Sequence, residues 1–231
     1  MKGLKLASFG VACLVMAGCV TAPKSIDNRG NFWQGIENKT VAVASNTLPE
    51  PGLHKMGSQG LLDLAIAAAV TSPVSDRLKQ ADLKPIQQTI SDVAKGLTAR
   101  GAEVKQIGPI DLNALPKSGG KANVQTAKDF SSLRSRHNAD YLYLLQVNTL
   151  GSARAYYGFI PMSDPTGLTN ATAQLVDLRN NNIVWQLPIH TEVAAWGEWN
   201  QKPEYPNLMK AFQQAMDLTR EKAVDEFLQV R

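Results

Sequence analysis

The sequence has little cysteine and no long apolar run. Its 231 residues include two cysteines, Cys13 and Cys19, and both lie close to the N-terminus. A disulfide framework in the rest of the chain is therefore excluded, so a folded domain has to be held together by its apolar core. No stretch reaches the roughly 18 apolar residues that predict a membrane-spanning helix.

Residues that carry chemistry are also scarce. The three histidines, His54, His137 and His190, lie far apart, and no HExxH or paired-cysteine spacing is present. The sequence contains no G-x-S-x-G motif. The segment "PKSGGKA" (116–122) lacks the first glycine of a phosphate-binding loop and has Ala122 where Ser or Thr would bind magnesium. We therefore expect no metal site, no cofactor and no enzymatic activity.

The charge balance excludes another class of function. The chain has 24 basic and 20 acidic residues. Two of the basic residues, Lys2 and Lys5, belong to the N-terminal segment described next, and without them the net charge is +2. No basic face of the kind that binds nucleic acid is visible.

The N-terminus has the pattern of an export signal. Lys2 and Lys5 form a positive region, and Leu6 to Ala17 form an apolar region of 12 residues. That length is too short to cross a membrane, which takes about 20 residues, but it is typical of a signal peptide.

The end of this segment, Met16-Ala17-Gly18-Cys19, resembles the lipobox of bacterial lipoproteins. The resemblance implies cleavage before Cys19 and acylation of that cysteine, which would anchor the protein firmly in a membrane. Val20 follows where an aspartate would imply retention in the inner membrane, so we expect an outer-membrane anchor with the domain facing the periplasm. The expected organisation is a signal peptide over 1–18, the lipidated Cys19 with a flexible tether over 19–38, and one domain over 39–231.

The tether is rich in Pro, Gly and Asn. A flexible coil of this length spans on the order of 25 Å. Within it, Phe32 and Trp33 are expected to dock on the domain, with the lipid surface as the alternative.

The first half of the domain alternates strands and helices. Hydrophobic periodicity and the positions of Pro and Gly predict a strand over 40–45, a loop over 46–57, a helix over 59–70, a helix over 86–97 with Pro85 in its first turn and Gly101 at its end, a strand over 102–107 and a loop over 108–123.

The second half is mainly strand. The patterns predict a helix capped by Thr126, a central strand over 139–147, strands over 152–160, 169–178 and 183–195, a hairpin turn at 180–182, and a last helix capped by Asn207. Pro188 lacks a backbone donor, so its strand is expected to lie at an edge or to carry a bulge. The order β-α-β-α-β-β-β-α gives an α/β (α+β) fold, a single sandwich domain with a mixed sheet of about five or six strands flanked by helices.

Three stretches carry a family resemblance. They are "TVAVAS" (40–45), "HNADYLYLLQV" (137–147) and "ATAQLVDLRNNNIVWQ" (171–186). Together they resemble a group of envelope lipoproteins that includes the curli secretion lipoprotein CsgG, the N-terminal domain of TolB and the outer-membrane activators of penicillin-binding proteins. The resemblance implies the fold more than the function. The apolar segment 60–70, the short tether and the lack of paired membrane hairpins depart from that group.

Two aromatic stretches are the candidate binding surfaces. In "ARAYYGFIPMSDPTG" (153–167), Tyr156, Tyr157 and Phe159 precede a loop made rigid by prolines. In "AWGEWNQKPEYP" (195–206), strand alternation places Trp199 on the core face and Trp196 on the outer face. The expected function is a non-enzymatic binding or accessory component that contacts another envelope protein in cell-envelope assembly or regulation. The alternatives are a homo-oligomeric secretion or pore component of the curli type, and an enzyme without a recognisable motif.

Overall fold

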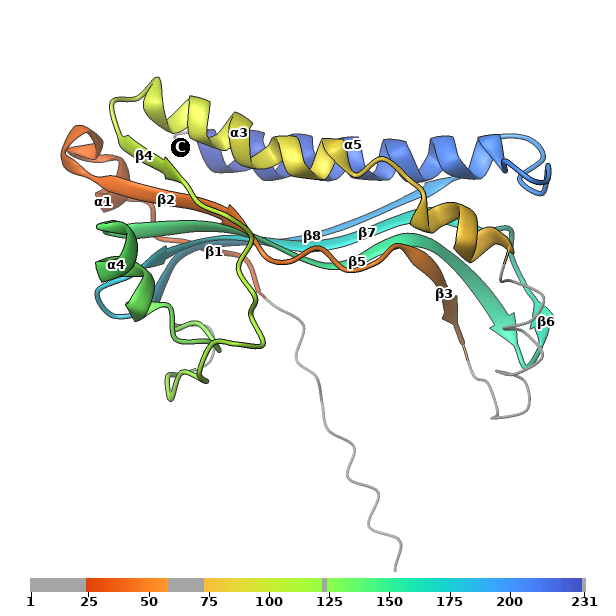
Figure 1. The fold of residues 1–231 in the computed structure, drawn as a ribbon, viewed down its shortest axis with the longest axis horizontal. Helices are drawn as coiled ribbons and strands as arrows, with labels where there is room; N and C mark the ends of the chain where they lie inside the picture. The colour runs from red at the N-terminus through yellow and green to blue at the C-terminus, as the bar shows by residue number, and fades with distance from the viewer. Residues whose placement is uncertain (1–23, 58–72, 122–123, 230–231) are drawn as a thin grey trace, which may run out of the picture.

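The computed structural model describes residues 24–57, 73–121 and 124–229 (Figure 1). The strands are β1 (Ile26–Asp27), β2 (Thr40–Ser45), β3 (Gly52–Met56), β4 (Glu103–Gln106), β5 (Tyr141–Tyr157), β6 (Ile160–Pro161), β7 (Thr166–Asp177) and β8 (Asn182–Ala194). The helices are α1 (Gly30–Trp33), α3 (Lys84–Thr98), α4 (Ser131–His137) and α5 (Pro206–Leu228), with a 3-10 turn over Ile36–Asn38 and further helical residues at 73–79. The expected helix over 59–70 lies outside the described residues.

The strands form one open mixed sheet. Its order is β1-β8-β7-β5-β2-β4, and β3 and β6 each pair with the far part of β5, which makes eight strands. The α/β (α+β) class and the single sandwich domain are confirmed. The expected strand number was too low because β1, β3 and β6 are short and lie in segments whose Pro and Gly content indicates a loop.

Two layers of unequal size cover the sheet. The helices α3 and α5 lie side by side along one face, and α4 with the long loop before it lies against the other (Figure 1). The larger apolar core lies between the sheet and the helix pair, while a smaller one, around Leu142, Leu144 and Val176, lies under α4.

The central strand is where the sequence places it. Residues 141–145 of β5 pair in parallel with β2 on one side, and β5 pairs antiparallel with β7 on the other. Leu144 is fully buried. The strand continues through an irregularity between Val147 and Thr149 as far as Tyr157. The strand expected over 152–160 is therefore the second half of β5, which ends at the turn residue Gly158 with its φ of +59°.

The last helix packs as its apolar stripe predicts. Leu208, Phe212 and Phe227 are fully buried against the sheet. The helix begins at Pro206, one residue before the expected cap Asn207, whose side-chain amide donates instead to the carbonyl of Glu198 (2.8 Å).

Two expected boundaries were wrong. Residues 52–56 form β3 rather than loop, because they pair in parallel with residues 151–155 of β5. The helix expected from Thr126 begins only at Ser131. The hydroxyl of Thr126 donates to the carbonyl of Lys128 (2.6 Å), and Asp129 accepts the backbone N–H of Ser131 (2.8 Å).

Residues 24–38 are not the flexible tether that their composition predicted. Strand β1 pairs with β8, and the guanidinium of Arg29 donates to the carbonyls of Glu226 (2.7 Å) and Phe227 (2.6 Å) at the end of α5. Phe32 is 1% exposed and Trp33 packs beside it, so both side chains dock on the domain as expected. The folded domain therefore begins no later than residue 24.

Candidate functional site

The β5–β6 hairpin closes the end of the sheet farthest from the β7–β8 turn. Tyr157 pairs with Ile160 across the hairpin, and Met56 at the end of β3 pairs with Ala155 on the other side of β5. Cross-strand partners and alternate residues along a strand share one face of a sheet. The side chains of Met56, Tyr157 and Ile160 therefore lie on the same face.

That face is the one that α5 leaves uncovered. Gly167 of β7 lies directly against the backbone of α5 at Ala211 and pairs with Ser152 of β5. By alternation from Ser152, Tyr156 points toward the helix layer and Tyr157 points away from it.

The hairpin end exposes a cluster of apolar side chains, which we call the distal patch. Seven large apolar side chains in the described residues are exposed, and five of them form this patch: Met56 (55%), Tyr157 (72%), Phe159 (56%), Ile160 (52%) and Met162 (66%). Large apolar side chains that are exposed together at one hairpin, rather than singly over the surface, mark an interaction site.

The expected partner-binding residues divide between core and surface. Tyr157, Phe159 and Trp196 are exposed as predicted, and Trp196 is 86% exposed. Tyr156 is 6% exposed and lies under the guanidinium of Arg154, so its assignment to the binding surface was wrong. Sequence reasoning missed Met56, because only the parallel pairing of β3 with β5 brings it to the hairpin.

Trp196 lies at the same end of the sheet as the distal patch. It follows the end of β8, where Ala194 pairs with Thr166. Nearby, the indole N–H of Trp199 donates to Asp164 (3.0 Å), and the guanidinium of Arg154 stacks over the Trp199 ring (4.6 Å) and donates to the carbonyl of Ser163 (2.7 Å). These contacts fix the loop after β8 against the loop after β6.

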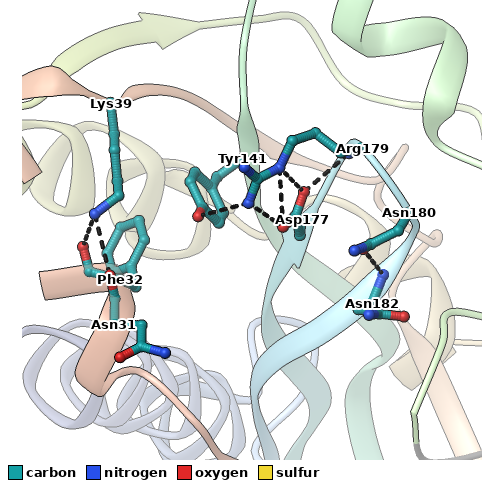
Figure 2. Close-up of polar contacts among 8 residues, drawn as sticks. All are labelled: Asn31, Phe32, Lys39, Tyr141, Asp177, Arg179, Asn180 and Asn182. Atoms are coloured by element: carbon teal, nitrogen blue, oxygen red, sulfur yellow. Dashed lines mark hydrogen bonds and ion pairs between the residues drawn. The ribbon is translucent and has the colours of Figure 1, made fainter. Parts of the chain in front are cut away.

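The opposite end of the sheet carries a polar cluster (Figure 2). The guanidinium of Arg179, just after β7, makes two-pronged contact with the carboxylate of Asp177 (2.5 and 2.9 Å) and donates to the hydroxyl of Tyr141 (3.2 Å). Burial acts to raise the pKa of Asp177, but the hydrogen bonds and charge of Arg179 outweigh it and hold the pKa below its ordinary value. The pKa of Arg179 is raised by the same contact, so both groups are ionised at neutral pH.

Beside this cluster, Lys39 holds the end of α1. Its ammonium donates to the carbonyls of Asn31 (3.2 Å) and Phe32 (2.8 Å), as Figure 2 shows, and also to the carbonyl of Gln34. Burial lowers the pKa of Lys39. A cleft of about 380 Å³ lies between these groups and is lined by Asn31, Tyr141 and Arg179. The charges are paired and the carbonyls accept hydrogen bonds, so these groups stabilise the fold. We call Lys39, Asp177 and Arg179 the polar lock, because they hold the N-terminal segment and the β7–β8 turn in place.

A larger cleft of about 580 Å³ lies under the sheet, between its α4 face and the loop residues 112–120 and 125–130. Polar side chains of β5, β7 and β8 form its floor: Gln146, Thr172, Gln174 and Gln186. Lys117 and Lys128 line it from the loop.

Within the described residues, no group of three or more His, Cys, Asp or Glu side chains is placed to hold a metal ion. His54 contacts the carbonyl of Leu150 (3.0 Å), and His190 contacts Asn170 (2.5 Å). His137 is the last residue of α4, as expected. In the part of the chain that the structure describes, no helix has the length and apolar character needed to cross a membrane. Cys19 lies outside the described residues.

No family model and no curated protein matches the chain. Remote likeness exists to solved structures. Protein XCC0632 from Xanthomonas campestris is 10% identical with a TM-score of 0.39 and coverage of 82% of this chain and 83% of that one. A putative neuraminyllactose-binding hemagglutinin homolog from Helicobacter pylori is 10% identical, with a TM-score of 0.37 and coverage of 83% and 84%. Lipoprotein GNA1162 from Neisseria meningitidis is 14% identical, with a TM-score of 0.28 and coverage of 76% and 96%.

At these identities and TM-scores, no property passes from those proteins to this chain. The resemblance to the curli-secretion group stays a prediction.

Proposed function

We propose that this protein is an outer-membrane lipoprotein, anchored through acylated Cys19, that faces the periplasm and binds another envelope protein through the distal patch. In this role it is a non-enzymatic accessory component in the assembly or regulation of the cell envelope. The observation that carries the proposal is the exposure of five large apolar side chains at one end of an otherwise well-buried sheet.

The composition of the distal patch favours a protein partner. Tyr, Phe, Met and Ile offer large contact area, and aromatic anchors of this kind dominate protein interfaces.

The position of the distal patch leaves it free for a partner. Leu144 of β5 lies in the same row as Gln186 of β8, whose amide contacts Lys24, the first described residue. Tyr157 lies 13 residues farther along β5. At the rise of a strand this is roughly 40 Å, so the patch and the point where the chain leaves toward Cys19 lie far apart on the sheet.

The anchor is tested by Cys19→Ser. We expect the variant to lack acyl chains by mass spectrometry and to leave the membrane fraction, because one side-chain sulfur carries the attachment. Cys13→Ser is the matched control, and it should fractionate as wild type. An undiminished membrane share of Cys19→Ser would contradict the anchoring.

Partner binding is tested by Tyr157→Ala combined with Trp196→Ala. Chemical crosslinking in intact cells should lose its protein adducts while the melting temperature stays at the wild-type value, because both side chains are exposed. Adducts that prove to be a second copy of this chain would support the homo-oligomeric alternative. Retained adducts would contradict the assignment of the patch.

A further inference from the structure

The floor of the larger cleft contains two polar groups that the fold leaves unused. Gln174 and Thr172 are 6% and 8% exposed. Among the described residues, the amide of Gln174 and the hydroxyl of Thr172 have no hydrogen-bond partner, although both line the cleft. Their neighbours are occupied, because Gln146 donates to Asn148 (2.9 Å) and Gln186 donates to the carbonyl of Lys24 (2.8 Å). Their polar atoms are not among the fully enclosed atoms without partners, so they face the open space of the cleft, where a ligand would complete their hydrogen bonds.

The charge of the cleft selects an anionic ligand. No Asp or Glu is among its described lining residues, whereas Lys117 is exposed at its rim and Lys128 is half-buried in its wall. Lys128 donates to the carbonyl of Leu115 (3.2 Å), which leaves its remaining N–H groups free to contact a ligand.

The carboxylates nearest along the loop, Asp111 and Asp129, are not among the residues that line the cleft. Asp111 accepts the backbone N–H of Asn113 (2.9 Å), and Asp129 accepts that of Ser131 (2.8 Å). Both acids are therefore engaged in shaping the loop and the start of α4. Two ammonium groups beside free amide and hydroxyl groups match a phosphate with hydroxyl substituents.

The cleft opens beside the path to the membrane anchor. Gln186 lines the cleft and holds Lys24, which is five residues after Cys19. Five extended residues span at most about 18 Å. A phospholipid next to the acylated cysteine is therefore within reach of the cleft.

We propose that this cleft binds the phosphorylated headgroup of a phospholipid from the membrane that holds the chain. The inference rests on the proposed anchoring at Cys19, and it is independent of the distal patch. Lys117 and Lys128 contact the phosphate, while Gln174 and Thr172 contact the polar substituent of the headgroup.

Two variants separate binding from folding. Lys117→Ala removes an exposed ammonium, and Gln174→Leu replaces an unpartnered amide with an apolar group of similar size. Neither change removes a hydrogen bond of the fold. Lys222→Ala, an exposed lysine on α5, is the control for charge, and Thr169→Val is the control for the loss of an unpartnered buried hydroxyl on the helix face of β7.

The experiment uses the full acylated protein in nonionic detergent, titrated by calorimetry with dihexanoyl phosphatidylglycerol, with inorganic phosphate and with dihexanoyl glycerol, which lacks the phosphate. We expect phosphatidylglycerol to bind. Each cleft variant should weaken this binding about tenfold, the effect of one lost hydrogen bond to the ligand. Both controls should bind as wild type. Gln174→Leu and Thr169→Val should melt at or above the wild-type temperature.

Three outcomes would overturn the inference. Equal binding of dihexanoyl glycerol would show that the acyl chains, not the phosphate, are recognised. Equal binding of inorganic phosphate would make the cleft a site for free phosphate. Unchanged affinity in both cleft variants would place the lipid elsewhere. Mass spectrometry of Cys19 in the same preparation reports on the anchor separately, so failure of the anchor and failure of the cleft are distinguishable.

Discussion

Aromatic side chains are buried at one end of the sheet and exposed at the other. At the end where α1 and the β7–β8 turn lie, which we call the proximal end, six aromatic rings pack together with centroids 4.7–6.4 Å apart: Phe32, Trp33, Tyr141, Tyr143, Trp185 and Phe227. At the distal end, Tyr157 and Phe159 are more than half exposed.

The difference between the ends does not come from a shortage of packing partners. On its helix face the distal end is tightly packed, since Tyr156 and Ser152 are buried there and Gly167 touches α5. Only the face away from the helices exposes apolar groups. The aromatic residues of the proximal end therefore maintain the fold, whereas the exposed ones of the distal patch are not needed for it.

The largest expected effect is at the aromatic cluster. Phe227→Ala removes a fully buried ring and should lower the free energy of unfolding by about 3–5 kcal/mol. Phe159→Ala, the same change at the distal patch, should alter it by less than about 0.5 kcal/mol. Urea unfolding of both variants measures the two changes in the free energy of unfolding. Similar losses of unfolding free energy would show that the aromatic residues at the two ends do not differ in their contribution to the fold.

A smaller effect is expected where the distal end meets α5. A Cβ at Gly167 would lie 2.3 Å from the backbone of Ala211, which cannot rotate away. Gly167→Ala should therefore destabilise the domain by about 1–3 kcal/mol. Gly108→Ala is the control, because no atom lies within 4 Å of a Cβ there. Equal thermal unfolding of the two variants would mean that α5 does not pack tightly at this end.

The stabilising effect of the polar lock at the proximal end should depend on pH. Since the pKa of Asp177 is lowered in the folded chain, the carboxylate stabilises the fold above its unfolded pKa and loses that effect as the pH falls through its folded pKa. Asp177→Asn should cost about 1–2 kcal/mol at pH 7, because its partner Arg179 is half exposed. The difference from wild type should shrink below about pH 4. A difference that is constant with pH would mean that the ion pair does not stabilise the turn.

The smallest effect on stability belongs to the distal patch itself. Met56→Ser combined with Met162→Ser should leave the melting temperature within about 2 °C of wild type, because both side chains are mainly exposed. The same pair should weaken crosslinking to the partner, since Met56 and Met162 widen the contact around Tyr157. A sharply lowered melting temperature would place these side chains in the core.

The sequence predicted the features that depend on local pattern. The continuous apolar run at 139–147 gave the central strand, and the stripe from Leu208 to Phe227 gave the last helix. Asn181 closes the hairpin with a φ of +58°, a conformation that asparagine tolerates well. Pro188 lies in β8, which is an edge strand there because its pairing with β1 is limited to Trp185 and Gln186.

The local sequence pattern could not predict the elements that depend on pairing with distant parts of the chain. Residues 52–56 contain Gly and follow two prolines, so only their parallel partner in β5 makes them a strand. The segment 24–38 has the composition of a tether, and its order comes from contacts with α5 and β8 that are more than 150 residues away. For the same reason the distal patch could be predicted in part, from Tyr157 and Phe159, but not through Met56.

The most direct test of a free binding surface at the distal end is photo-crosslinking in intact cells. A photoreactive phenylalanine replaces Tyr157 in one variant and Lys222 on α5 in another, since both positions are exposed. We expect a discrete protein adduct from position 157 and none from position 222. Adducts to lipid alone at position 157, or the same protein adducts from both positions, would contradict it.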